Sequence, residues 1–118
     1  MLDAITYFDN CLRKLWQTIG DLPEYRGKTT LVVTSDHGRG GTLADWHSHG
    51  KDVPGADQIW MAIVGPDTPA RGEVENSVEV FQRDIAPTIL DLMGIDYREY
   101  DGVLGKPIEL SVSGSTRH

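Results

Sequence analysis

The chain has little basic charge, one cysteine and no long apolar run. Its 118 residues carry 11 Lys and Arg against 18 Asp and Glu, a formal net charge of -7, whereas proteins contact nucleic-acid phosphates through clustered basic residues. No apolar run approaches the roughly 20 residues that span a bilayer. Cys11 cannot form an internal disulfide, and we expect a buried, inert thiol. We therefore expect one domain, no nucleic-acid partner and no membrane span.

Apolar periodicity predicts two helices. Residues 3–19 repeat apolar side chains at three- and four-residue spacing, which predicts an amphipathic helix that ends at Gly20. Residues 83–93 predict a second helix, in which Asp84 is expected to cap the N-terminus and Gly94 to follow the C-terminus.

Two short apolar segments predict strands. The segment "TTLVVTS" at residues 29–35 is β-branched without alternation, which is typical of a strand covered on both faces. The segment "QIWMAIVG" at residues 58–65 has the same character, and we expect Trp60 to lie in the core. Residues 71–81 predict either a short edge strand or an extended segment. The order of helix, strand, loop, strand and helix predicts an α/β fold, whose ligands bind at the carboxyl ends of strands.

The residues that carry chemistry gather in one glycine-rich loop, "TSDHGRGGTLADWHSHG" at residues 34–50. Asp36 and His37 are adjacent, and Gly38 tolerates unusual dihedral angles, which brings both side chains toward one point. His49 follows later in the same loop. Carboxylate oxygens and imidazole nitrogens are ligands for Zn²⁺ or Mn²⁺. The same spacing also suits a polar loop in which the aspartate bonds its own backbone.

Five segments, in this order, resemble the C-terminal part of an alkaline-phosphatase-superfamily enzyme: "TTLVVTSDHGRG", "WHSHG", "GADQIWMAIVGP", "DIAPTILDLMGI" and "DGVLGKPI". That superfamily groups alkaline phosphatases, nucleotide pyrophosphatases and phosphodiesterases, sulfatases and cofactor-independent phosphoglycerate mutases. The resemblance covers residues 1–110. It implies part of an alkaline-phosphatase-like sheet flanked by helices, with the N-terminal portion of that catalytic domain missing. We expect residues 111–118 to form a flexible tail.

The resemblance also implies a two-metal site. Asp36 and His37 resemble ligands of one ion, and His49 resembles a ligand of its neighbour, with Zn or Mn as the divalent metal. His47 is a reserve candidate for metal or substrate binding, and Arg39 is a candidate for contacting a phosphate oxygen. The nucleophile and further ligands that the family places earlier in the fold have no counterpart here. We therefore assign no catalytic residue and expect weak metal binding and no turnover from this chain alone.

The implied parent is a metal-dependent hydrolase of phosphate esters, of the phosphatase or phosphodiesterase type, acting on a small phosphorylated or sulfated substrate. Phosphate is favoured over sulfate because a histidine at position 49 suits two metal ions, whereas sulfatases usually use one Ca²⁺ with oxygen-rich ligands. A mutase acting on sugar phosphates stays open. Two alternatives also stay open: a non-catalytic binding or assembly module with a vestigial metal loop, and a zinc-binding loop with a structural role. Self-association through an exposed sheet edge is expected; periplasmic, secreted and cytoplasmic locations all remain open.

Overall fold

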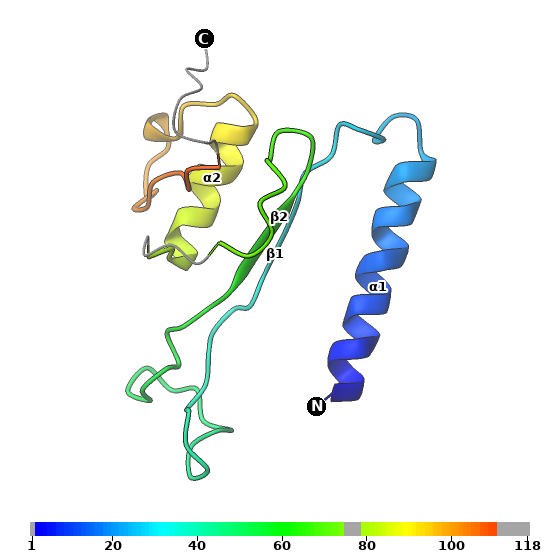
Figure 1. The fold of residues 1–118 in the computed structure, drawn as a ribbon. Helices are drawn as coiled ribbons and strands as arrows, with labels where there is room; N and C mark the ends of the chain where they lie inside the picture. Colours follow the sequence, from blue (N-terminus) through cyan, green and yellow to red (C-terminus); the bar gives the residue numbers. More distant parts are fainter. Residues whose placement is uncertain (1, 75–78, 111–118) are drawn as a thin grey trace.

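A computed structural model describes residues 2–74 and 79–110 (Figure 1). In chain order its elements are helix α1 (Leu2–Asp21), strands β1 (Leu31–Thr34) and β2 (Met61–Val64), the 3₁₀ turn η1 (Gln82–Asp84), helix α2 (Ile85–Leu92) and the 3₁₀ turn η2 (Tyr97–Glu99). The predicted tail at residues 111–118 and the middle of the predicted segment 71–81 lie outside the described residues. The described part is a small α/β arrangement, as the order of predicted elements indicates.

The two strands form an antiparallel pair (Figure 1). Leu31 pairs with Val64 at one end, and Thr34 pairs with Met61 at the other. All four residues of β1 are half-buried, and Trp60, just before β2, is 55% exposed. The predictions of a strand covered on both faces and of a core tryptophan are therefore wrong for this chain, because no described helix packs closely on the sheet.

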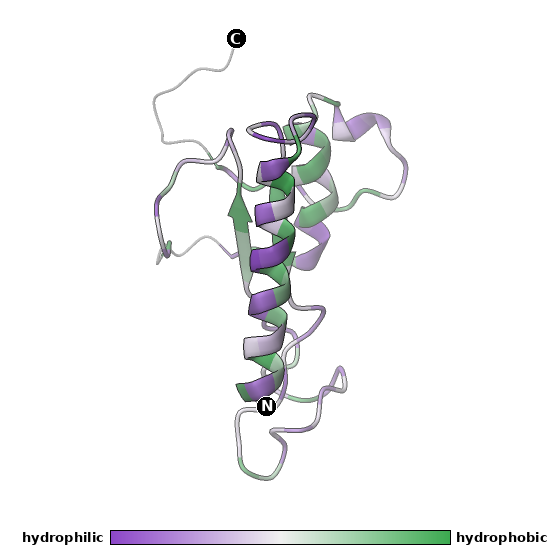
Figure 2. Ribbon diagram, turned by 90° about the vertical axis from the view of Figure 1, so that its right-hand side faces the viewer, coloured by the Kyte–Doolittle hydropathy of each residue, from purple (hydrophilic) through white to green (hydrophobic). Residues whose placement is uncertain are grey.

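Helix α1 stands apart from the other elements (Figure 1). Hydrophilic and hydrophobic segments alternate along it (Figure 2), which agrees with the predicted amphipathic pattern. None of its described residues is buried, and its apolar face includes Phe8, which is 51% exposed. Cys11 is exposed as well, so the expectation of a buried thiol is wrong, because no described element packs on this part of the helix. No described helix is both long and apolar enough to cross a membrane.

The C-terminal end of α1 approaches the sheet at a shallow hollow of about 260 Å³, lined by residues that include Trp16, Ile19, Tyr25, Arg26, Val64 and Pro66. The helix does not end at Gly20 but continues to Asp21. A glycine with left-handed backbone first occurs at Gly27, with φ +69°. The change of direction toward β1 is therefore made in the turn after the helix, where a positive φ favours glycine.

Helix α2 is joined to the segment at residues 105–108 through two buried polar side chains. Asp84 is 7% exposed and Thr88 is 2% exposed. The Asp84 carboxylate accepts hydrogen bonds from the backbone N–H of Phe81 (2.9 Å) and of Lys106 (3.2 Å). The Thr88 hydroxyl donates to the Asp84 carbonyl and accepts from the N–H of Ile108 (2.9 Å). Asp84 is therefore a buried structural residue: it occupies the predicted N-cap position of α2, but its side chain makes no capping bond to that helix.

The end of α2 follows the prediction. Gly94 has φ +73°, its N–H donates to the Asp91 carbonyl (3.0 Å), and the N–H of Ile95 donates to the Leu90 carbonyl (2.9 Å). This pair of bonds is a Schellman motif, which requires a left-handed residue and so favours glycine.

Candidate metal site

The glycine-rich loop connects β1 to β2 and is closed at its base by backbone contacts. The N–H of Gly38 donates to the Ala56 carbonyl (2.7 Å), and the N–H of Gly40 donates to the Ser48 carbonyl (3.0 Å). At the strand end, the Thr34 hydroxyl lies 2.9 Å from the Trp60 carbonyl oxygen. The loop therefore folds back on itself and brings its two halves together beside the end of β1.

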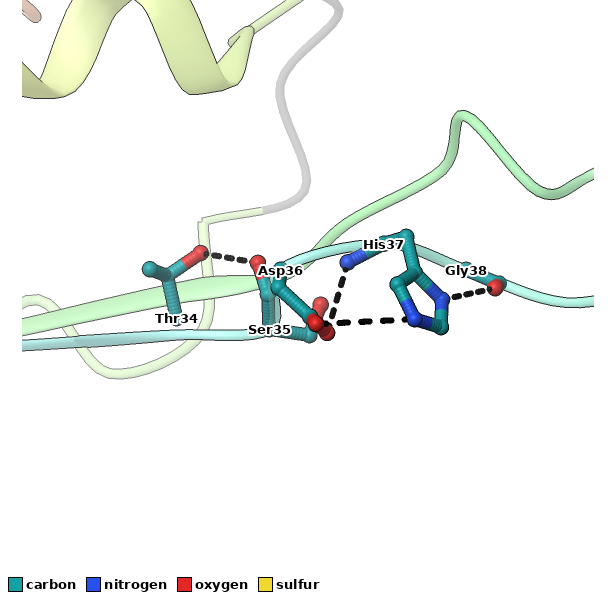
Figure 3. Close-up of polar contacts among 5 residues, drawn as sticks. All are labelled: Thr34, Ser35, Asp36, His37 and Gly38. Carbon is teal, nitrogen blue, oxygen red and sulfur yellow. Dashed lines mark hydrogen bonds and ion pairs between the residues drawn. The ribbon is translucent and has the colours of Figure 1, made fainter. Parts of the chain in front are cut away.

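Asp36 and His37 meet directly after β1 (Figure 3). The backbone N–H of His37 donates to Oδ1 of Asp36 (2.9 Å), and Nε2 of His37 lies 3.5 Å from Oδ2 of the same carboxylate. The other ring nitrogen, Nδ1, lies 2.8 Å from the carbonyl oxygen of Gly38. Both side chains are solvent-accessible, 82% for Asp36 and 43% for His37. The site is thus a shallow, polar surface at the strand end.

His49 comes from the second half of the loop and stacks on His37. The two ring centroids are 4.4 Å apart, and the ring planes differ by 20°. The three residues predicted as metal ligands are therefore neighbours in pairs, Asp36 with His37 and His37 with His49. In the described residues, however, no three His, Cys, Asp or Glu side chains form a group that could hold one metal ion.

The reserve candidates lie on the same loop but outside that arrangement. His47 packs edge-on against Trp46, with ring centroids 5.6 Å apart, and both residues are exposed. Arg39 is also exposed and follows the Asp36–His37 pair by two residues.

Asp45, a further acidic residue of the loop, is engaged in a local turn. Its Oδ1 accepts from both the N–H (2.8 Å) and the hydroxyl (2.6 Å) of Thr42. The hydrogen bond from the Thr42 hydroxyl, followed by that from its N–H, lowers the pKa of Asp45. Asp45 therefore stabilises the loop conformation.

Two features of the site escaped sequence reasoning. The Ser35 hydroxyl, next to Asp36, is buried and finds no hydrogen-bond partner in the described structure, which is costly for a polar group. Gly38 is needed for space, since an added Cβ would overlap the carbonyl oxygens of Gly55 and Gln58. A serine next to an Asp-His pair is not a pattern that predicts a buried hydroxyl. The close contact at Gly38 could not be predicted either, because it involves Gln58, 20 positions away in the sequence.

Comparison with known proteins identifies the family. Residues 1–95 match the family model described as Sulfatase. The chain is 33% identical over 101 residues to a 2,3-bisphosphoglycerate-independent phosphoglycerate mutase of Picosynechococcus sp., covering 80% of this chain and 18% of that protein. It is 29% identical over 105 residues to the protein of the same name from Thermomicrobium roseum, covering 81% of this chain and 18% of the relative. No solved structure matches significantly.

The chain thus spans about a fifth of the length of these curated relatives. The family match includes the loop with Asp36, His37 and His49, which is the part of the chain where the polar chemistry gathers. The resemblance read from the sequence motifs is confirmed by both comparisons. The chain belongs to the sulfatase family, within the alkaline phosphatase superfamily.

Proposed function

We propose that this chain supplies part of the two-metal site of an enzyme that hydrolyses phosphate esters, of the phosphatase or phosphodiesterase type. Asp36 and His37 would hold one divalent ion, and His49 would hold its neighbour. The observation that carries the proposal is the arrangement of the Asp36 carboxylate and the His37 imidazole, 3.5 Å apart, beside the stacked ring of His49.

The tautomer of His37 supports metal binding at Nε2. A carbonyl oxygen can only accept a hydrogen bond, so Nδ1, 2.8 Å from the Gly38 carbonyl, carries the hydrogen in the neutral ring. Nε2 then carries the lone pair of the neutral ring and lies 3.5 Å from Oδ2 of the Asp36 carboxylate. Two such electron-rich groups favour a shared cation. Tetrahedral Zn²⁺, with bonds of about 2.1 Å, separates adjacent ligand atoms by about 3.4 Å, close to the observed 3.5 Å.

The stacking of the two imidazoles supports neighbouring ions. Its centroid spacing of 4.4 Å is similar to the separation of about 3.5–4 Å between the ions of two-metal sites. Divalent ions of this kind act as Lewis acids that stabilise charge on a transferring phosphoryl group and lower the pKa of its nucleophile. Zn²⁺ and Mn²⁺ both accept this Asp and His ligand set.

The remaining loop residues would act on the substrate. Arg39 is the candidate for contacting a phosphate oxygen, because guanidinium groups bind phosphate through charge-assisted hydrogen bonds. His47 is the reserve candidate for metal or substrate, since it lies two residues before His49 and is exposed. The substrate would be a small phosphorylated or sulfated compound.

Phosphate transfer is favoured over sulfate transfer by the relatives. Both are named as phosphoglycerate mutases, which act on a phosphate ester by that name. Their 33% and 29% identity also makes a mutase the second candidate function. The two candidates share the same phosphoryl-transfer site and differ in whether water or a substrate hydroxyl accepts the phosphoryl group.

Calorimetric titration of the chain with Zn²⁺ and with Mn²⁺ tests the ligand assignment. The wild-type chain is expected to bind with measurable heat, and the double variant His37→Ala, His49→Ala to lose that binding. Leu43→Ala is the matched control, because Leu43 lies in the same loop, is 96% exposed and has no ligand atom, so this variant is expected to retain binding. Coincident curves for the wild type and the double variant would refute the metal assignment.

An assay with an aryl phosphate and added metal tests the need for residues beyond these three. We expect no turnover, because the three ligands do not complete either metal site and no nucleophile is assigned. Turnover that copurifies with the chain and disappears in the double variant would overturn that expectation.

A further inference from the structure

The residue after the Asp-His pair makes three separate backbone contacts at the base of the loop. We propose that Gly38 is the positioning residue of this site: its carbonyl orients the imidazole of His37, and its N–H and missing side chain keep the loop base closed. The expected effect of Gly38 on metal affinity rests on the proposed function. Its effect on the His37 ring and on loop closure does not require a metal.

The first contact holds the loop closed. The N–H of Gly38 donates to the carbonyl of Ala56 at 2.7 Å. Ala56 is 6% exposed and is the buried hydrophobic residue of the described chain. The hydrogen bond therefore fixes Gly38 to a buried residue near the end of the loop that leads into β2.

The second contact explains why residue 38 must be glycine. An added Cβ would overlap the carbonyl oxygens of Gly55 and Gln58, and backbone oxygens cannot move aside as the end of a flexible side chain can. Gly38 does not have a positive φ, whereas Gly55 does, at +89°. The requirement at position 38 is therefore space rather than dihedral freedom, contrary to the expectation from the sequence.

The third contact connects this backbone packing to the site. The carbonyl of Gly38 accepts from Nδ1 of His37 at 2.8 Å (Figure 3), so the ring orientation and tautomer depend on where Gly38 lies. Backbone carbonyls that bond the second nitrogen of a metal-binding histidine fix the tautomer in this way, and losing such a partner typically costs 10–100-fold in metal affinity. Any displacement of Gly38 from Ala56 and Gly55 would thus also change the position of the His37 ring and of its Nε2 atom.

The experiment compares Gly38→Ala with Gly41→Ala. Gly41 lies in the same loop, and an added Cβ there would meet nothing within 4 Å, so it is the matched control. Imidazole ¹⁵N spectra of the metal-free chains at about pH 8, above the reference imidazole pKa of about 6.5, report the tautomer of His37. We expect the Nδ1–H tautomer in the wild type and in Gly41→Ala, and its loss in Gly38→Ala. Zn²⁺ affinity is expected to fall roughly 10–100-fold in Gly38→Ala.

The outcomes separate the two proposals. An Nε2–H tautomer in the wild-type chain, or the same His37 spectrum in Gly38→Ala and Gly41→Ala, would overturn the positioning role of Gly38 whatever the metal does. The wild-type spectrum decides the carbonyl contact even if Gly38→Ala does not fold. If the tautomer changes as expected but the wild type binds Zn²⁺ no better than His37→Ala, His49→Ala, the positioning role stands and the proposed metal site fails.

Discussion

At the residue scale, the loop is shaped by local hydrogen bonds from short polar side chains. Asp45 accepts two hydrogen bonds from Thr42, and its own carbonyl accepts from the N–H of Ser48 (2.7 Å). These bonds form a turn between the two halves of the glycine-rich loop. They tie one carboxylate oxygen of Asp45, Oδ1, to the local turn.

We predict that this turn weakens in acid. The Thr42 hydrogen bonds lower the pKa of Asp45 in the folded chain, so they favour the ionised carboxylate. Their stabilisation is fully present above the unfolded pKa of about 3.9 and is lost as the pH falls through the lower, folded value. The Thr42 amide resonance, followed by NMR during acid titration, should therefore shift with a midpoint below about pH 3.9. A midpoint above that value, or no shift of this amide, would contradict the assignment.

At the element scale, α2 and the segment that follows η2 are joined by buried polar groups. Asp84 and Thr88 lie one helical turn apart, so their side chains lie on the same face of the helix. Asp84 accepts a hydrogen bond from the N–H of Lys106, and Thr88 accepts one from the N–H of Ile108. Gly105 completes this contact, because an added Cβ would overlap the Arg83 carbonyl. The buried Pro87, less than 2% exposed, lies between the two polar residues. The contact holds a segment that has no helix or strand of its own against α2.

We predict that removing these side chains releases that segment. Asp84→Ala leaves the N–H groups of Phe81 and Lys106 without their acceptor, and bonds to a charged acceptor are each worth about 1.5–3 kcal/mol. Amide exchange of Lys106, measured by hydrogen exchange and NMR, should accelerate by roughly ten- to a hundredfold, since about 1.4 kcal/mol is a factor of ten. Thr88→Val should accelerate exchange at Ile108 by less, because its hydroxyl is uncharged.

Asp91→Ala is the control for both variants. Asp91 lies in the same helix but is exposed, and surface substitutions usually change stability by less than about 0.5 kcal/mol. Equal exchange rates at Lys106 in Asp84→Ala and Asp91→Ala would show that the buried carboxylate does not hold the segment.

At the scale of the whole molecule, the described chain is extended rather than closed around a core. Its radius of gyration is 16.7 Å, whereas a compact domain of this length is expected near 13.5 Å. Apolar side chains of α1, such as Ile5 at 59% exposure, remain accessible. Both strands of the two-stranded sheet also have one edge without a partner strand in the described structure. Unpaired edges of this kind promote pairing with other chains.

We predict that the chain associates with itself through these edges. Sedimentation velocity should give a weight-average mass that rises with concentration, and Ala62→Lys should reduce the rise, because a lysine on an exposed strand opposes edge pairing. Leu43→Lys is the control, since Leu43 is 96% exposed in the loop and outside the strands. A mass that stays at that of the monomer at every concentration would argue against self-association.

The sequence by itself determined the family, the element types and the loop that carries the polar chemistry. Amphipathic spacing gives α1, β-branched runs give both strands, and Gly94 ends α2 where a left-handed residue is needed. These features are local, because each depends on residues within a few positions of one another. The order of motifs along the chain was also read from the sequence, and the family match confirms the resemblance that it indicated.

Only the tertiary structure decided which of these residues meet and which are covered. The stacking of His49 on His37 and the close approach at Gly38 join residues far apart in the sequence, so no local pattern encodes them. The burial of Asp84 was not predicted from the sequence, and the exposure of Trp60 and Cys11 contradicts what the pattern predicted. Whether an apolar or polar side chain is buried depends on the elements packed against it, and that packing is a property of the folded chain.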